Sequence, residues 1–369
     1  MGLLPVGQHL FRASSPPTPP NPPLHTIKIM KYTLLASIVL ISSLAFAQYK
    51  PEGPHLSNLK QLTHGGQNAE AYWSPAGSKL IFQSTRDGHE CDQIYIMNAD
   101  GTDQHMVSTG EGVTTCAYFL PDGDEFVYAS THEAGPSCPA PADRSKGYVW
   151  AVYPGFDIYR ANASTGKIEK KLTDTPRYDA EATVNFADDK IVYTSLSSGD
   201  LELWSMNLDG SGKKQLTKSE GYDGGAVFSR DGSKVVWRAH RPKTEQARKE
   251  ASDLLADDLT APMKMELFIA DADGSHEKQI TDFGCASFAP TFTPDGKKIL
   301  FASNRHACDT REFELYLINT DGTGLEQVTF FDGFTSFPEF SPDGKKLAFE
   351  SDYHSTGEYE FNVFTADWK

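Results

Sequence analysis

The stretch that decides the fold runs from Tyr72 to Gly101 and reads YWSPAGSKLIFQSTRDGHECDQIYIMNADG. It holds two short apolar segments, Lys79 to Gln83 and Gln93 to Met97, each flanked by turn residues. Proline presets φ for the second position of a turn and glycine accepts positive φ, so Ser-Pro-x-Gly and Asn-x-Asp-Gly are typical hairpin connections. The stretch therefore predicts short β-strands joined by tight turns.

The same order of segments returns six times along the chain. A tripeptide that ends in Thr or Ser marks each copy, and the successive hydroxyl positions are 45, 65, 44, 64 and 48 residues apart. This spacing indicates a repeat of about 40–48 residues with two insertions of about 20 residues. The marking hydroxyl residues are Thr63, Ser108, Thr173, Thr217, Thr281 and Thr329.

Each repeat contains a first strand, a Pro-Asp-Gly-like turn, a second and a third strand, and an Asp-Gly turn before a fourth strand. One turn, Asn185 to Asp189, is degenerate. Six copies of four antiparallel strands predict an all-β fold, a six-bladed β-propeller over residues 59–369. The last repeat stops at Lys369 after its third strand, and Leu59 to Thr63 is a fourth strand without a repeat. We expect these two strands to pair, closing the ring and removing an exposed edge.

The first 47 residues are expected to lie outside the fold. Residues 1–29 include a proline-rich run and are interpreted as a disordered, non-native upstream extension. Residues 30–47 carry Lys31, a short apolar run and the sequence Ala45-Phe46-Ala47, which is the pattern of a signal peptide cut before Gln48. Residues 48–58 are expected to be a linker.

The charge of the chain excludes one large class of function. The 369 residues contain 34 Lys and Arg against 50 Asp and Glu, a net charge of −16. Without residues 1–47 the balance is 31 against 50, or −19. No basic excess is available to neutralise phosphates, so no nucleic-acid partner is expected. No later apolar stretch predicts a membrane span, and we expect a periplasmic or secreted protein.

The repeats resemble the TolB-like family of envelope propellers, whose blades share a W-S-P-D-G turn and an I-Y-x-M-N-x-D-G segment. The closest copies are Tyr72 to Pro75, Ile94 to Gly101 and Phe340 to Gly344. The resemblance covers residues 59–369 and implies an exported propeller. Propeller lyases with metal-binding histidines are similar to TolB-like repeats, which implies a second class of function.

Both long insertions, His132 to Gly155 and Arg241 to Lys264, fall between second and third strands. They are therefore expected on one face of the ring, here called the inserted face. The first insertion is proline-rich and presents Tyr148 and Trp150, and the second has the pattern of a short helix. Long loops on a rigid scaffold commonly carry binding function.

All five cysteines map to the inserted face. Cys285 and Cys308 occupy the same relative places in the fifth repeat as Cys116 and Cys138 in the second. This correspondence predicts the disulfides Cys116–Cys138 and Cys285–Cys308, with Cys91–Cys116 as the competing pair and one thiol left free. No C-x-x-C motif occurs, so stapled loops are favoured over redox catalysis.

Polar side chains gather at the starts of first strands, where they would face a central channel. With residues of the insertions they predict a funnel for a cation, a basic peptide segment or a polar glycan. The candidate ligand-binding residues are His64, Glu70, Tyr148, Trp150, Asp179, Glu181, Asp223, Arg238 and His240.

Two functions follow from these observations. The first is an exported, non-catalytic binding module in the cell envelope, with no cofactor, whose inserted face holds a protein or polar ligand. The alternative is a metal-dependent lyase or hydrolase acting on acidic polysaccharide, with a divalent metal at His240, His306 and His354. The chain has no G-x-S-x-G, P-loop or H-E-x-x-H motif, which favours the first function.

Overall fold

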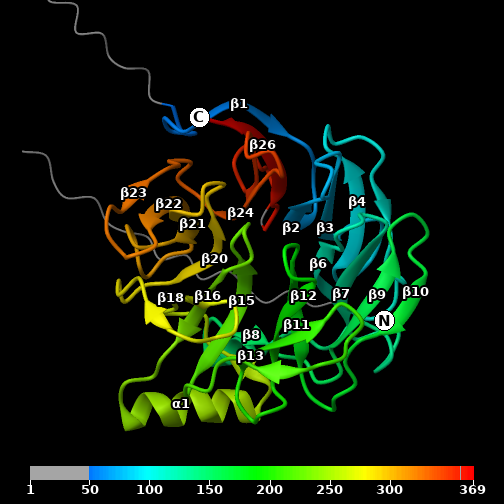
Figure 1. The fold of residues 1–369 in the computed structure, drawn as a ribbon, viewed down its shortest axis with the longest axis vertical. Helices are drawn as coiled ribbons and strands as arrows, with labels where there is room; N and C mark the ends of the chain where they lie inside the picture. Colours follow the sequence, from blue (N-terminus) through cyan, green and yellow to red (C-terminus); the bar gives the residue numbers. More distant parts are fainter. Residues whose placement is uncertain (1–49, 358) are drawn as a thin grey trace, which may run out of the picture. The chain divides into compact units, whose positions relative to one another are not determined.

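The computed structural model describes residues 50–357 and 359–369. The expected upstream extension and signal peptide lie outside these residues. The described residues form six four-stranded antiparallel sheets arranged as a ring (Figure 1). The prediction of an all-β, six-bladed propeller is confirmed.

Each blade runs from an inner first strand to an outer fourth strand. Blade one contains β2 (Gln67–Trp73), β3 (Lys79–Thr85), β4 (Gln93–Asn98) and β5 (His105–Met106). Blade two contains β6 (Thr114–Phe119), β7 (Glu125–Ser130), β9 (Asp157–Asn162) and β10 (Ile168–Lys171). Blade three contains β11 (Asp179–Asn185), β12 (Lys190–Ser195), β13 (Glu202–Asn207) and β14 (Lys214–Gln215).

The other three blades repeat this order. Blade four contains β15 (Tyr222–Phe228), β16 (Lys234–His240), β18 (Glu266–Asp271) and β19 (Lys278–Gln279). Blade five contains β20 (Ser287–Phe292), β21 (Lys298–Ser303), β22 (Glu314–Asn319) and β23 (Glu326–Gln327). Blade six contains β24 (Thr335–Phe340), β25 (Lys346–Ser351), β26 (Asn362–Trp368) and, as its outer strand, β1 (Leu56–Gln61).

The outer strand of blade six comes from the other end of the described chain. β1 pairs antiparallel with β26, and Leu56 lies opposite Trp368 and Gln61 opposite Phe364 (Figure 1). This strand begins three residues before the predicted Leu59 and ends before Thr63. Thr63 lies beyond the end of β1, and its hydroxyl forms a hydrogen bond with β26.

The hydroxyl that marks each repeat fastens the outer strand to the third strand. Thr63 Oγ1 accepts the backbone N–H of Val363 at 2.8 Å, and Thr173 Oγ1 accepts that of Ile158 at 2.8 Å. The other four blades make the same bond at 2.8–2.9 Å. A buried N–H is costly when it is left unpaired, so the bond explains why the repeat keeps Thr or Ser here.

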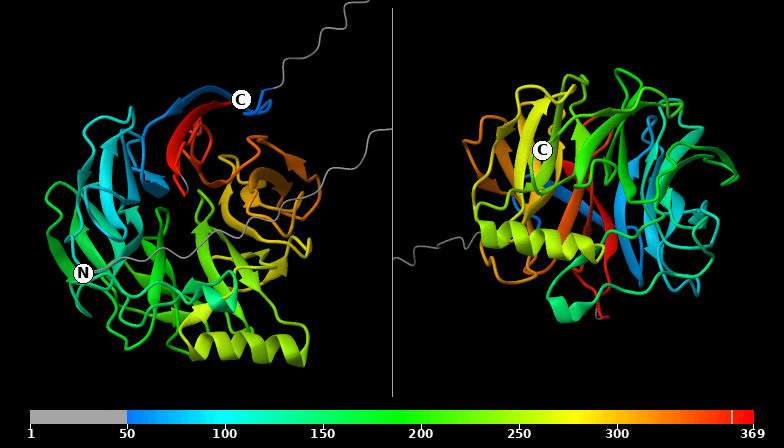
Figure 2. Two further views of the ribbon diagram at one scale, coloured as in Figure 1. Left: turned by 180° about the vertical axis from the view of Figure 1, so that it is seen from behind. Right: turned by 90° about the horizontal axis from the view of Figure 1, so that it is seen from below.

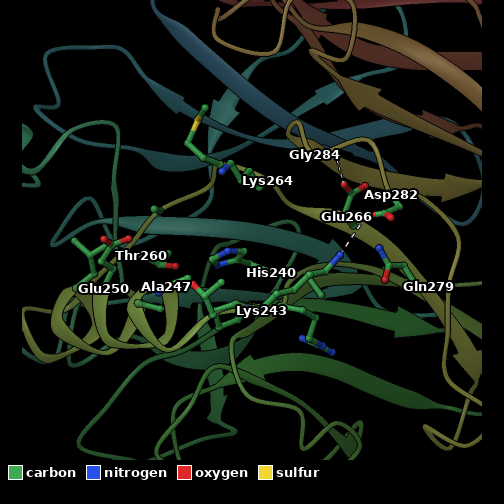
Figure 3. Close-up of a pocket in the computed structure, with 18 of the residues that line it drawn as sticks. His240, Lys243, Ala247, Glu250, Thr260, Lys264, Glu266, Gln279, Asp282 and Gly284 are labelled. Carbon is green, nitrogen blue, oxygen red and sulfur yellow. Dashed lines mark hydrogen bonds and ion pairs between the residues drawn. The ribbon is translucent and has the colours of Figure 1, made fainter.

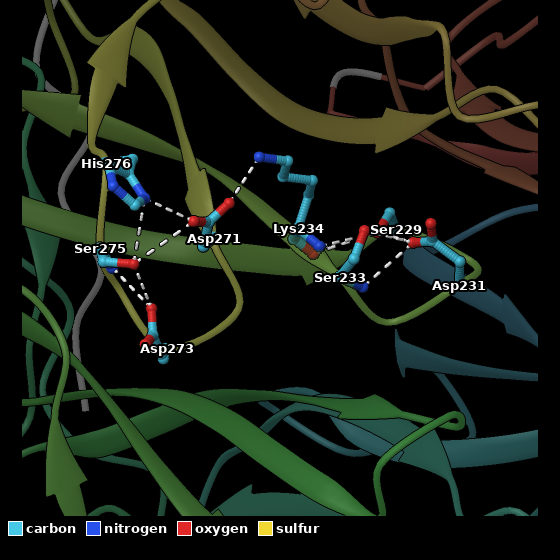
Figure 4. A network of polar contacts seen from close by, with 8 residues as sticks. All are labelled: Ser229, Asp231, Ser233, Lys234, Asp271, Asp273, Ser275 and His276. Atoms are coloured by element: carbon cyan, nitrogen blue, oxygen red, sulfur yellow. Dashed lines mark hydrogen bonds and ion pairs between the residues drawn. The ribbon is translucent and has the colours of Figure 1, made fainter.

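The aspartates of the turns are occupied by local hydrogen bonds, as blade four shows (Figure 4). Asp231 Oδ1 accepts the Ser229 hydroxyl at 2.6 Å and the Ser233 N–H at 3.0 Å. These bonds lower the pKa of Asp231 to about 2. Asp273 likewise accepts the Ser275 N–H at 2.9 Å. Turn chemistry therefore accounts for these Asp-Gly pairs.

The core lies between neighbouring blades. Ile81 and Ile96 of blade one, for example, pack with Phe119 and Phe126 of blade two, and all four side chains are fully buried. Each sheet therefore stabilises the next, and the ring positions the loops at its two faces.

The two insertions meet and join. β8 (Trp150–Ala151) of the first pairs antiparallel with β17 (Leu259–Thr260) of the second. The first insertion also holds a short 3-10 helix, Arg144–Lys146, and Lys146 forms an ion pair with Asp257. The second insertion contains the predicted helix, α1 (Glu245–Ala256), which lies along one side of the ring (Figure 2).

The structure contains two disulfides, and one of them corrects the predicted pairing. Cys285–Cys308 is confirmed. Cys116–Cys138 is wrong, and so is the competing pair Cys91–Cys116, because Cys138 is bonded to Cys91 and Cys116 is a buried free thiol. The first insertion folds back toward blade one, where the Gly112 N–H donates to the Pro136 carbonyl at 2.9 Å. Cys116 lies in an inner strand and faces the channel instead.

The degenerate turn of blade three gives a test of the repeat. Asp189 is the left-handed residue of this turn, with a φ of 47°, and it is exposed; in the turn of blade five the left-handed residue is Gly296, one position earlier in the register, with a φ of 69°. Left-handed backbone is strained for any residue with a Cβ. We expect Asp189→Gly to raise the free energy of unfolding by about 0.5–1 kcal/mol, measured by urea denaturation.

The reverse change, Gly296→Asp, is the matched control because a Cβ there meets no heavy atom within 4 Å. It should lower the free energy of unfolding by a similar amount. A destabilising Asp189→Gly would show that the left-handed backbone of Asp189 is not strained.

Candidate functional site

The six inner strands each carry a β-bulge at the same register. One residue of every bulge has left-handed backbone, with φ between 49° and 59°. These residues line one narrow cavity of about 40 Å³ at the centre of the ring, here called the waist. Bulges of this kind re-aim a side chain. The six bulge residues are Glu70, Cys116, Glu181, Gly225, Ala289 and Phe337.

A wider cavity of about 320 Å³, here called the funnel, opens from the waist on the inserted face. Glu70, Cys116, Glu181, Arg238 and Phe337 line both the waist and the funnel. The walls of the funnel are mainly aromatic and come from blades two, three, five and six and from the first insertion. They include Tyr148, Trp150, Tyr153, Phe156, Tyr178, Phe288 and Phe334.

The other end of the channel, here called the opposite mouth, is a cavity of about 420 Å³. The prolines of four turns line it together with aromatic side chains, among which Phe186 is 43% exposed. Glu339 lies between this mouth and the waist, and it accepts the Thr291 hydroxyl at 3.1 Å. Burial raises the pKa of Glu339 to about 7.

A buried ion pair forms one side of the funnel floor. Glu181 pairs with Arg238, and it also accepts the hydroxyls of Thr194 at 2.6 Å and Tyr222 at 3.0 Å. The Arg238 guanidinium lies over the rings of Trp150 and Tyr222, 5.2 and 5.4 Å from their centroids. Glu181 and Arg238 therefore hold each other and Trp150 in place.

The other side of the floor carries groups whose pKa values are raised by burial. Burial raises the pKa of Glu70 to about 7, against the opposing effect of a hydrogen bond with Cys116. Burial, followed by the charge of Glu70, raises the pKa of the Cys116 thiol well above its usual value. Burial also raises the pKa of Asp92, although it accepts hydrogen bonds from Thr85 and Gln83. The floor thus holds a carboxyl group that exchanges its proton near neutral pH.

Five of the nine predicted ligand-binding residues meet at the funnel: Glu70, Tyr148, Trp150, Glu181 and Arg238. Asp223 does not, because it is fully buried and accepts hydrogen bonds from Arg241 at 2.7 Å and Trp237 at 2.5 Å. Asp179 is also buried, where it accepts the Thr175 hydroxyl at 2.8 Å. The hydrogen bonds of these two aspartates are therefore made within or beside their own blades. His64 is exposed and lies outside the lining of the funnel.

His240 lines a separate cavity of about 480 Å³ between α1 and blade four (Figure 3). Lys243, Lys264 and Glu266 line the same cavity, and Glu266 accepts the Gly284 N–H at 2.7 Å. Burial, with Lys264 and Arg241 nearby, lowers the pKa of His240. His240 therefore lines a cavity other than the funnel.

The three predicted metal ligands stand on three different blades. His240 ends β16, His306 Nδ1 lies 3.0 Å from the Tyr316 hydroxyl, and His354 stacks on Tyr353 with ring centroids 3.8 Å apart. Within residues 50–357 and 359–369, no three His, Cys, Asp or Glu side chains are placed to hold one metal ion. The donor set of these described residues therefore does not fit a metal centre.

Sequence reasoning missed several residues of the funnel. Gln83 accepts the Thr115 hydroxyl at 2.9 Å and the Cys116 N–H at 3.0 Å, and Asp92 lies beside it. Phe288, Phe334 and Phe337 form part of the wall. The repeat contained a signal for Phe337, since it aligns with Glu70 and Glu181 in the first strand. Nothing comparable marked Gln83 or Asp92.

The ring, its inner bulges and its channel define a six-bladed β-propeller. A TolB structure from Agrobacterium tumefaciens has a TM-score of 0.55 and 17% identity, covering 84% of this chain and 97% of that one. TolB from Acinetobacter baumannii has a TM-score of 0.52 and 16% identity over 82% of this chain and 64% of that one. An oligogalacturonate lyase in complex with manganese has a TM-score of 0.51 and 15% identity, covering 84% of this chain and 93% of that one. Identities this low establish a shared fold alone.

Comparison of sequences gives shorter matches. A TolB homolog of Chlorobium chlorochromatii is 26% identical over 138 residues, 31% of each chain. The uncharacterized peptidase YuxL of Bacillus subtilis is 26% identical over 188 residues, 51% of this chain and 24% of its own. The chain thus spans less than a third of the length of either relative, and no family model matches it. The resemblance to TolB-like propellers is confirmed as a resemblance of fold.

The raised pKa of Glu70 predicts how stability depends on pH. Its folded pKa of about 7 exceeds the ordinary 4.5, so the folded state binds the proton more tightly. Stability is then greatest below pH 4.5, falls as pH rises toward 7 and levels off above it. We expect Glu70→Gln to shrink the loss of unfolding free energy between pH 5 and pH 8 by on the order of 2 kcal/mol.

Urea denaturation at both pH values measures this difference. Glu111→Gln, which alters an exposed carboxylate, is the control and should leave the difference unchanged. Equal pH dependence in Glu70→Gln and the unaltered protein would show that Glu70 does not titrate in this range.

The separation of the three histidines predicts the outcome of metal analysis. After dialysis, mass spectrometry of the purified chain should find well under one equivalent of any divalent metal. His240→Ala and His306→Ala should leave that content unchanged, because the two side chains share no site. One equivalent of metal that is lost in both variants would overturn this expectation and restore the lyase or hydrolase alternative.

Proposed function

We propose that the chain is an exported binding module, without catalysis of its own, whose funnel holds a protein segment or another polar ligand. The observation that carries this proposal is the pairing of β8 with β17. Two insertions from different blades join there and set Tyr148 and Trp150 at the edge of one cavity. A loop that served only to cover its own blade would not need that partner.

The composition of the funnel supports a binding role. Binding sites for small ligands are commonly concave, mostly apolar and supplied with a few convergent polar groups. The funnel has aromatic walls and a floor of Glu70, Glu181 and Arg238. Tyr148, which is 40% exposed, and the half-buried Trp150 offer broad contact area at low cost in side-chain entropy.

The rim of the funnel is held from several sides before any ligand arrives. The Cys91–Cys138 disulfide ties the first insertion to blade one, and the ion pair of Lys146 with Asp257 ties it to the end of α1. Trp150 also lies against Arg238. Preorganisation of this kind reduces the entropy lost on binding.

The floor groups support binding over nucleophilic catalysis. The pKa of the Cys116 thiol is raised by burial, whereas a cysteine nucleophile requires the thiolate. Glu181 is engaged by Arg238, Tyr222 and Thr194. We therefore assign the floor groups to recognition.

Two disulfides support an oxidising compartment such as the periplasm or the cell exterior. Across residues 50–357 and 359–369, we find no helix with the length and apolarity needed to cross a membrane. The proposed partner is a protein segment or polar ligand that reaches the inserted face.

A thermal-shift screen tests this proposal. The purified chain would be screened against peptides, oligosaccharides and small polar compounds, and hits would be confirmed by calorimetry. A ligand at 100 times its Kd should stabilise the fold by about 2.7 kcal/mol. We expect Trp150→Ala to weaken a confirmed ligand at least tenfold, because it removes a wall of the funnel.

Phe186→Ala is the matched control, since it removes an exposed aromatic side chain at the opposite mouth. It should leave affinity unchanged. Ligands that bind Trp150→Ala as well as the unaltered chain, or that are lost only in Phe186→Ala, would place binding elsewhere and refute the proposal.

A further inference from the structure

The funnel floor is lined by an arginine with an unpaired, buried N–H and by a carboxyl group. Arg238 is 7% exposed, and its Nε–H has no hydrogen-bond partner although it is buried. The same side chain lines both the waist and the funnel. Glu70 lines both cavities too and interacts with the Cys116 thiol. A ligand group that accepts from Arg238 and donates to Glu70 would satisfy both residues at once.

The charges of the floor disfavour an acidic ligand. Three carboxyl groups line the funnel, those of Glu70, Asp92 and Glu181, against the one guanidinium of Arg238. Glu181 is paired with Arg238, and no described Lys, Arg or His forms an ion pair with Glu70 or Asp92. Arg238 is already paired with Glu181, and Glu70 becomes charged above about pH 7, so in that range a uronic acid or a sulfated sugar would bring a second negative charge beside Glu70. Like charges brought together at a binding site act against that partner.

Arg238 also disfavours a cationic ligand. Its guanidinium already lies over Trp150 and Tyr222, so an incoming ammonium group would meet a positive charge where it needs a free aromatic face. An uncharged hydroxyl group has neither difficulty. A hydroxyl both donates and accepts, which matches a floor lined by both Glu70 and Arg238.

The walls match the remaining surface of a sugar. Tyr153, Phe334 and Phe337 are half-buried, and with Trp150 and Tyr148 they leave part of the aromatic surface facing the cavity. Aromatic rings of this kind suit the flat C–H faces of a pyranose ring. The volume of about 320 Å³ lies at the small end of ligand sites, which fits a short oligosaccharide.

We propose that the funnel binds an uncharged oligosaccharide, with ring faces against the aromatic wall around Trp150 and hydroxyl groups bridging Arg238 and Glu70. This inference rests on the proposed function and names its ligand class. It separates the chain from an activity on acidic polysaccharide, because the same floor that accepts hydroxyl groups opposes carboxylates.

Calorimetric titration of the purified chain tests the inference with five probes. Three are uncharged: cellohexaose, maltohexaose and hexa-N-acetylchitohexaose. Oligogalacturonate hexamer is the acidic probe and spermidine is the cationic probe. We expect at least one uncharged hexasaccharide to bind, to change the tryptophan fluorescence and to keep its affinity within threefold between low and high salt, because no net charge is neutralised.

Variants locate the binding. Trp150→Ala and Glu70→Ala should each weaken the bound saccharide at least tenfold, and Phe186→Ala should leave it unchanged. Glu70→Gln should bind the saccharide more tightly than Glu70→Ala does, since an amide still accepts a hydroxyl. Far-ultraviolet circular dichroism checks that each variant is folded, and Trp150→Phe replaces Trp150→Ala if the latter is not.

The outcomes separate this inference from the proposed function. Failure of all three uncharged probes, or binding of oligogalacturonate or spermidine alone, overturns the saccharide assignment. If a peptide found in the thermal-shift screen then binds the unaltered chain but not Trp150→Ala, the proposed binding module stands and only the saccharide assignment falls. If a saccharide binds Trp150→Ala as tightly as the unaltered chain, the funnel is not its site and both proposals fall.

Discussion

The propeller depends on one buried hydrogen bond that is repeated in every blade. A Thr or Ser hydroxyl accepts the N–H at the start of the third strand, as Thr173 does from Ile158 at 2.8 Å. Four of the outer strands are only two residues long, too short to hold an edge by ladder bonds alone. The hydroxyl attaches each outer strand to its third strand. The six blades therefore share one structure, and their inner strands lie at the same level along the channel.

The waist forms because the six inner strands lie at the same level along the channel. Every inner strand bulges at the same register, and five of the six bulge residues carry a side chain despite left-handed backbone. Such strain persists only where the surrounding structure enforces it, and it is common at functional sites. Here it aims Glu70, Cys116 and Glu181 into the channel. The buried pair of Glu181 and Arg238 contributes more to the form of this floor than to stability, because desolvation offsets much of its attraction.

The floor and the rim of the funnel have different origins. The floor belongs to the repeat and exists because six bulges converge. The rim belongs to the two insertions, which break the repeat and hold each other through Trp150 and Thr260. Contact between Trp150 and Arg238 links the two parts. The funnel is therefore formed by a regular scaffold together with two irregular loops.

The repeat pattern alone predicts the blades, their turns, a helix in the second insertion and the convergence of Glu70, Glu181 and Arg238, and the structure contains all of them. Those features follow from local turn chemistry and from a period that places equivalent residues at equivalent heights. Three features became visible only in the folded chain: Cys138 bonds to Cys91, Asp223 pairs with Arg241, and His240 lines a cavity beside α1. These outcomes depend on how loops from different blades fold across one another. No repeat specifies that path, because each insertion occurs once.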